Sequence, residues 1–127
     1  MEQTQLDTVR GWFAGRLPEG WFEAPPDVSY ADDQLKVVGA LAAPKYPQDA
    51  TDAARAGAEA GRIARFREET RRYRIWIARE AEHSFEVNVQ WGARCGGTTT
   101  EFNPGGSGRR RGEGGEQGGQ EPRPVEI

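Results

Sequence analysis

The stretch GRIARFREETRRYRIWIAREAEH, residues 61–83, decides how this chain folds. Its apolar or small side chains recur at steps of three and four residues, at Ile63, Phe66, Thr70, Tyr73, Ile77 and Ala81. This spacing places them on one face of an α-helix. Upstream, Asp49 or Thr51 is suited to cap a helix, and Asp52 favours its first turn. We therefore predict one long amphipathic helix over residues 49–83.

The charges along this stretch support the same prediction. Glu68 precedes Arg72 by four residues and Arg65 precedes Glu69 by four, spacings at which opposite charges pair along a helix. A competing interpretation exists for residues 73–77, YRIWI, which also suit a β-strand. The turns that flank them are rich in Arg, Glu and Ala, and these residues favour the helix.

A shorter helix is predicted near the N-terminus, over residues 5–17. Four apolar residues lie on one face of it at helical spacing, namely Leu6, Val9, Phe13 and Leu17. Thr4 is suited to cap this helix, and Pro18 ends it.

Four short segments have strand character and form two hairpins, 28–30 with 35–41 and 85–91 with 98–102. The clearest is 85–91, where apolar and polar residues alternate. Residues 31–34 and the turn Cys95-Gly96-Gly97 connect the strands within each pair. The order helix, hairpin, long helix, hairpin predicts an α+β fold. In it, the long helix covers one face of a small antiparallel sheet.

Composition limits the size of this domain. Leu, Ile, Val and Phe together make up only about 16% of the 127 residues, and the chain holds 17 Gly and 8 Pro. Residues 103–127 are rich in Gly, Arg and Glu, and their only larger aliphatic residues are Val125 and Ile127. We expect a single domain over residues 1–102 and a disordered tail over 103–127.

Several classes of function are disfavoured by what the sequence lacks. Cys95 is the only cysteine and His83 the only histidine, so no internal disulfide or multi-cysteine metal site can form in one chain. A thiol-dependent enzyme would need these two residues together with an orienting acid, and no spacing demands it. We expect no catalytic residues, cofactor, metal or small-molecule substrate. No signal peptide or membrane span is recognisable, which predicts a cytoplasmic protein.

Two stretches resemble a known family. One is Gly15-Arg16-Leu17-Pro18 with Gly20-Trp21-Phe22 and the hairpin 33–39, and the other comprises 61–70, 77–82 and 91–96. Together they resemble an uncharacterised family from high-GC bacteria, over roughly residues 12–102. The resemblance implies a continuation that is similar to a ribbon-helix-helix DNA-binding unit. This sequence departs from that pattern at Asn103. The order of elements is also similar, more weakly, to the BON domain.

Two features of the chain suggest a binding surface. The first is a surplus of tryptophan for so small a core, and we single out Trp12, Trp21 and Trp76. These rings either form a docking patch or fill the core in place of Leu and Ile. The second is the arginine content of residues 53–85, eight arginines against five glutamates in a chain of net charge -3. Helical spacing places Arg65, Arg72 and Arg79 along one flank, near Trp76.

These arginines are open to two interpretations. They either pair with neighbouring glutamates as a solvated helix face, or they track phosphates beside an aromatic platform. The tail adds three further candidates for contact with nucleic acid, Arg109, Arg110 and Arg111. Our leading hypothesis is a non-enzymatic binding or assembly module that docks a protein partner or a second copy. The alternative is a nucleic-acid-associated protein or a truncated DNA-binding regulator.

Overall fold

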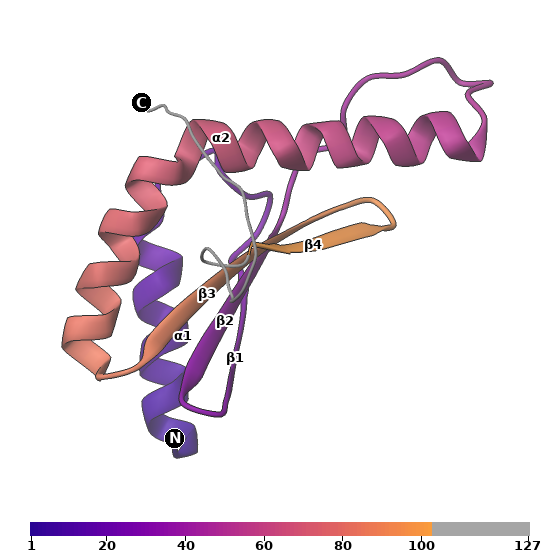
Figure 1. The fold of residues 1–127 in the computed structure, drawn as a ribbon. Helices are drawn as coiled ribbons and strands as arrows, with labels where there is room; N and C mark the ends of the chain where they lie inside the picture. Colours follow the sequence, from indigo (N-terminus) through magenta and orange to yellow (C-terminus); the bar gives the residue numbers. More distant parts are fainter. Residues whose placement is uncertain (103–127) are drawn as a thin grey trace, which may run out of the picture.

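The computed structural model describes residues 1–102, and their elements follow the order α1–β1–β2–α2–β3–β4 (Figure 1). These elements are α1 Gln3–Arg16, β1 Asp27–Ala31, β2 Gln34–Ala40, α2 Asp52–Phe85, β3 Asn88–Cys95 and β4 Thr98–Phe102. The α+β class is confirmed, with two hairpins, a short N-terminal helix and a long second helix. The predicted tail, which includes Arg109, Arg110 and Arg111, lies outside the described residues.

The four strands form one sheet in the order β1-β2-β3-β4. Each hairpin is antiparallel, as predicted, but β2 and β3 run parallel and pair Leu35 with Val89 and Val37 with Trp91. The sheet as a whole is therefore mixed rather than antiparallel. The reason is that α2 forms a crossover connection between β2 and β3. It returns the chain to the end of the sheet at which β2 starts, so that β3 runs in the same direction as β2.

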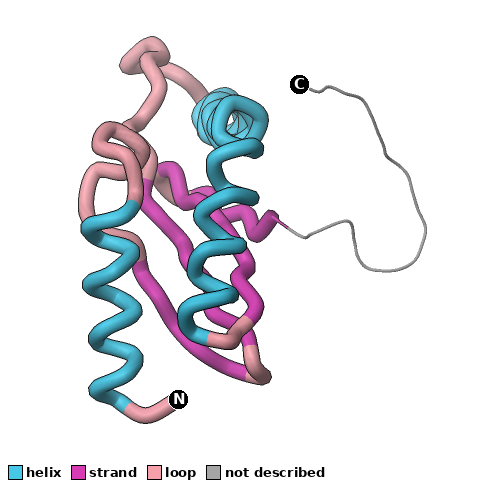
Figure 2. Tube along the Cα trace, turned by 90° about the vertical axis from the view of Figure 1, so that its left-hand side faces the viewer, coloured by secondary structure: helices cyan, strands magenta, loops and turns pink. Residues whose placement is uncertain are grey.

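Both helices cover the same face of this sheet (Figure 2). The core between them contains fully buried side chains from both layers, including Val9, Phe13, Leu35, Val37, Ile77 and Ala81. Along β2 the buried and partly exposed residues alternate, as expected for a strand with one covered face. The other face is polar and is crossed by ion pairs such as Lys36 to Glu101, at 2.7 Å.

The predicted long helix is confirmed as one continuous element. Thr51 caps it by accepting a hydrogen bond from the backbone N–H of Ala54, at 3.1 Å. Residues 73–77 are helical, so the strand alternative is wrong. The helix is not straight, however. Figure 1 shows it bend sharply, so that its first half crosses the top of the molecule and its second half descends beside the sheet.

The boundaries of three elements differ from the predictions. Helix α1 begins earlier, because Glu2 rather than Thr4 caps it. The first hairpin turns within two residues, Asp32 and Asp33, whose φ angles of 53° and 62° match the twist of the flanking strands. Strand β3 starts at Asn88, since Phe85 still belongs to α2 and Glu86 ends that helix in the left-handed conformation.

Candidate functional site

Near the middle of α2, Thr70 is at the centre of a set of side-chain hydrogen bonds of a kind that bends helices. The Thr70 hydroxyl donates to the carbonyl oxygen of Phe66 at 2.6 Å, a contact that is known to bend helices. Arg74 then donates from Nε to the Thr70 hydroxyl at 2.9 Å and from Nη2 to the carbonyl oxygen of Arg67 at 2.7 Å. This last bond spans seven residues, so the Arg74 side chain connects two turns of the helix.

Arg74 is a buried cation with no acidic partner among residues 1–102. Only 6% of the residue is exposed, and its guanidinium lies 4.9 Å from the centre of the Phe102 ring. The guanidinium of Arg67 lies over the same ring, at 5.3 Å. Burial, together with the neighbouring charges of Arg67 and Arg71, lowers the pKa of Arg74 to about 9. The pattern of the sequence did not indicate this cluster.

The face of α2 that packs on the core is the predicted one with a single exchange, since Ile63, Phe66, Thr70, Ile77 and Ala81 are all buried. The predicted stripe included Tyr73, but this residue is 55% exposed and Arg74 takes its place. The assignment of Tyr73 to the buried stripe was therefore wrong. A stripe drawn from Thr70 through Arg74 to Ile77 has equally good helical spacing. This spacing was the one feature of the sequence that could have indicated a buried Arg74.

The displaced Tyr73 forms part of an aromatic patch on the outer side of α2. Its ring stacks on that of Trp76, with centroids 6.3 Å apart and planes inclined by 20°. Trp76 is 60% exposed, and the neighbouring Ile75 is 40% exposed. We call Tyr73, Trp76 and the side chains that border them one turn away, Arg72, Arg79 and Glu80, the Trp76 face.

The other two candidate tryptophans lie elsewhere. Trp12 is half-buried and packs edge-on against Phe13 and Phe85, at 4.9 and 5.6 Å between ring centroids. Trp21 is also half-buried and packs against Phe66, at 5.5 Å. Both rings take the place of missing aliphatic residues in the core. Of the three candidates, Trp76 is the one on an open surface.

The candidate arginines of α2 are exposed and available. Within residues 1–102, Arg65, Arg72 and Arg79 make no ion pair, and the predicted pairs Glu68–Arg72 and Arg65–Glu69 do not form. Nearby glutamates have other partners. Glu80 accepts from Arg16 of α1 at 2.7 Å, and Glu82 accepts from the backbone N–H of Val89 at 3.1 Å.

His83 and Cys95 offer little chemistry in this arrangement. His83 is exposed in the last turn of α2, whereas Cys95 is fully buried at the end of β3. Burial raises the pKa of the Cys95 thiol, and the carboxylate of Glu59 raises it further. A raised pKa reduces the thiolate fraction, which is the nucleophilic form.

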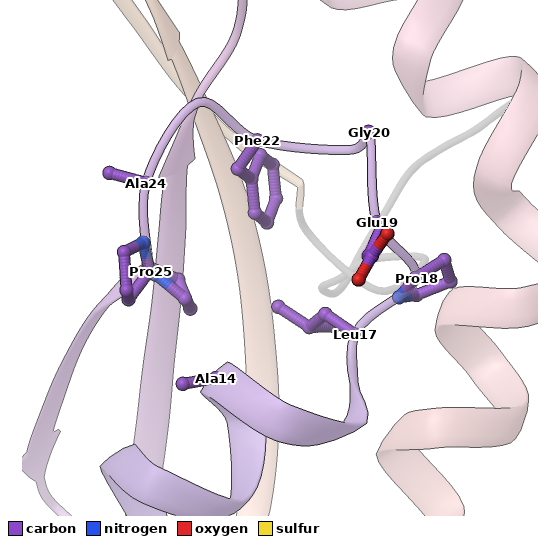
Figure 3. A pocket seen from close by; sticks show the side chains of 9 residues that line it. Ala14, Leu17, Pro18, Glu19, Gly20, Phe22, Ala24 and Pro25 are labelled. Atoms are coloured by element: carbon purple, nitrogen blue, oxygen red, sulfur yellow. The ribbon is translucent and has the colours of Figure 1, made fainter.

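A hollow of about 320 Å³ lies beside the connection between α1 and β1 (Figure 3). Apolar side chains and prolines such as Leu17, Phe22 and Pro25 line it, and Glu19 is its one ionisable side chain. General acid–base chemistry requires positioned proton donors and acceptors. A single exposed carboxylate does not supply such a pair, so we assign no reaction to this hollow.

Residues 7–101, nearly all of the described fold, match the family described as "Rv1265-like protein, N-terminal domain". The chain belongs to this family. Membership confirms the resemblance of this sequence to an uncharacterised family. No solved structure matches the chain.

Curated proteins from two mycobacterial species are similar to this chain. They include "Uncharacterized protein Rv1265" of Mycobacterium tuberculosis and "Uncharacterized protein Mb1296" of Mycobacterium bovis. Each is 44% identical to this chain over 101 residues, which is 80% of the chain and 43% of the relative. The chain therefore spans less than half the length of these relatives. Neither helix within residues 1–102 has the length and apolar character needed to cross a membrane.

Proposed function

We propose that this domain is a cytoplasmic, non-enzymatic binding or assembly module that docks a protein through the Trp76 face. One observation carries the proposal. The rings of Tyr73 and Trp76 stack on each other and are exposed to solvent on the outer side of α2, whose inner side packs on the sheet. Exposed aromatic groups of this kind are characteristic of protein interaction sites.

The chemistry around the rings also suits docking. Trp, Tyr and Arg are the residues that dominate the energetics of protein interfaces. Here Arg72 and Arg79 border Trp76 on one side and Tyr73 lies on its other side, and neither arginine forms an ion pair within residues 1–102. Ile77 and Ala81, both fully buried, anchor the same stretch of helix in the core. The backbone that carries the face is therefore already ordered before binding, which lowers the entropic cost of binding.

A photo-crosslinking amino acid at position 76 tests this proposal in cells that express the chain. We expect protein adducts from position 76 and few or none from position 99, an exposed site on β4 that serves as control. A second variant with Tyr73→Ser should reduce the yield at position 76. Equal yields at the two positions would contradict the proposal.

A second candidate function is nucleic-acid association. The observation in its favour is that Arg65, Arg72 and Arg79 are exposed without acidic partners in the described part of the chain. Such arginines are free to neutralise phosphates. On this proposal, Arg109, Arg110 and Arg111 contribute further contacts. We also propose, from the resemblance alone, that the remaining length of the relatives holds a ribbon-helix-helix-like unit.

Salt separates the two candidates. Binding to nucleic acid should weaken steeply with salt, because each neutralised phosphate releases bound counterions. Fluorescence anisotropy with labelled single- and double-stranded oligonucleotides, from low to physiological salt, measures this slope. Absence of binding at low salt would remove the nucleic-acid candidate for this chain.

A further inference from the structure

We propose that the Trp76 face binds the same face of a second copy of this chain, with the two helices parallel. This inference rests on the docking role proposed above and names the partner. A two-fold axis that runs midway between the second halves of the two α2 helices, and parallel to them, would bring Trp76 of one copy against Trp76 of the other. Such an interface uses one surface patch twice.

The charges that flank Trp76 are arranged for this pairing. At 3.6 residues per turn, Arg72 and Arg79 lie about 40° and 60° to one side of Trp76. Glu80 and Tyr73 lie about 40° and 60° to the other side. The face thus has a basic flank and an opposite flank with a carboxylate and an aromatic ring. A single patch with this division is complementary to itself in one orientation only.

The patch is complementary to itself when the two helices run parallel. When two parallel helices meet face to face, the left flank of one lies against the right flank of the other. Arg79 of each copy then lies near Glu80 of the second copy, and Arg72 lies near the second copy's Tyr73 ring. The first contact is a charge pair and the second a cation–π contact. In the antiparallel orientation, Arg72 would instead lie near Arg79 of the second copy, and the like charges would repel.

The fold leaves room for this contact. Figure 1 shows α1 and the sheet on the inner side of the second half of α2, while its outer side is not covered by another described element. The bend directs the first half of the helix over the sheet and away from this surface. Glu80 already binds Arg16, but 40% of its side chain stays exposed, so its carboxylate can accept a further donor.

Sedimentation equilibrium of the full chain tests self-association and orientation together. We expect a monomer–dimer equilibrium in which Trp76→Ala lowers the association constant by about thirtyfold, as for the central residue of an interface. Arg79→Glu should also weaken the dimer, because the new carboxylate would face Glu80. An antiparallel dimer would respond in the opposite way, since that substitution would relieve the repulsion from Arg72. Arg65→Glu, which makes the same charge change before the bend, is the matched control and should have little effect.

Disulfide cross-linking provides an independent measure of orientation. His83 lies about 20° from Trp76, two turns further along the same line. In the parallel dimer the two copies of residue 83 face each other. In an antiparallel dimer centred on Trp76, they would be about 21 Å apart along the axis. Under mild oxidation, His83→Cys should form a covalent dimer, and the parent chain should not, because Cys95 is buried.

The outcomes distinguish this inference from the function on which it rests. A chain that stays monomeric at all concentrations, or a His83→Cys variant that does not cross-link, would overturn the parallel dimer. If position 76 still gives adducts with another protein in cells, the docking role stands with a different partner. If neither dimers nor adducts form, both proposals fail.

Discussion

Arg74 occupies a place that hydrophobic spacing had assigned to Tyr73. A charged side chain is expected to face water, so the periodicity of residues 61–83 favoured the tyrosine. The structure buries the arginine because its guanidinium can donate to Thr70 and Arg67 and lie on the Phe102 ring. Phe102 belongs to the last strand, and no local pattern connects it to α2. Arg74 is therefore buried through contacts with Thr70, Arg67 and Phe102, while Tyr73 is exposed beside Trp76.

The buried charge of Arg74 predicts a pH dependence of stability. Burial lowers the pKa of Arg74 to about 9 in the folded chain, whereas in the unfolded chain it keeps its ordinary, higher value. Above about pH 9 the unfolded chain therefore binds the proton that the folded chain has released. Stability then rises with pH. Arg74→Met keeps an unbranched side chain but removes this titration.

Urea unfolding of the parent chain and the Arg74→Met variant, at pH 7, 8.5 and 10, measures this effect. The free energy of unfolding of the parent should rise relative to that of the variant between the first and last pH. Other titrating groups are common to both chains and cancel in the difference. A difference that stays constant with pH would show that Arg74 keeps its ordinary pKa.

At the scale of elements, α2 combines a predictable helix with a bend that was not predicted. The apolar stripe, the Thr51 cap and the charged outer face are all local features, and they correctly specify a helix that ends near His83. A bend is favoured where a threonine hydroxyl bonds back to the preceding turn, as that of Thr70 does to Phe66. Threonine can do this in any helix, and the choice is made by packing around it.

We expect Thr70→Val to lower the free energy of unfolding by about 1–3 kcal/mol. Valine has nearly the same shape as threonine, so the main loss is the hydroxyl that accepts from Arg74 Nε. A buried donor left without a partner accounts for the cost. Thr70→Ser keeps the hydroxyl and serves as the control, with a smaller loss from the missing methyl group. Chemical denaturation measures both, and equal losses would indicate that the hydroxyl does not matter.

At the scale of the whole molecule, the segment between α1 and β1 packs against both the sheet and the long helix. Phe22 lies against Gly39 of β2, where an added Cβ would come within 2.3 Å of the ring. The neighbouring ring of Trp21 packs edge-on against Phe66 of α2 and Trp91 of β3. This connection therefore joins the sheet to the long helix, and the glycine at position 39 is required for the close approach.

Gly39→Ala should destabilise the fold by about 1–3 kcal/mol, because the ring of Phe22 must move to admit the methyl group. Gly61→Ala is the matched control. Gly61 lies in α2 with nothing near its missing Cβ, so alanine should stabilise the helix by about 0.5–1 kcal/mol. Thermal unfolding distinguishes the two signs. A neutral Gly39→Ala would mean that the aromatic segment does not pack on the sheet.

Local sequence patterns were sufficient to predict the two helices, the four strands and the α+β class. Each of these depends on a periodicity or a cap within a few neighbouring residues. The sequence also singled out Trp76, Arg72 and Arg79. Tertiary structure alone decided that β2 and β3 run parallel, that Trp12 and Trp21 pack into the core, and that Arg74 rather than Tyr73 is buried. These outcomes depend on contacts between segments far apart in the chain, and such contacts leave no periodic signal in the sequence.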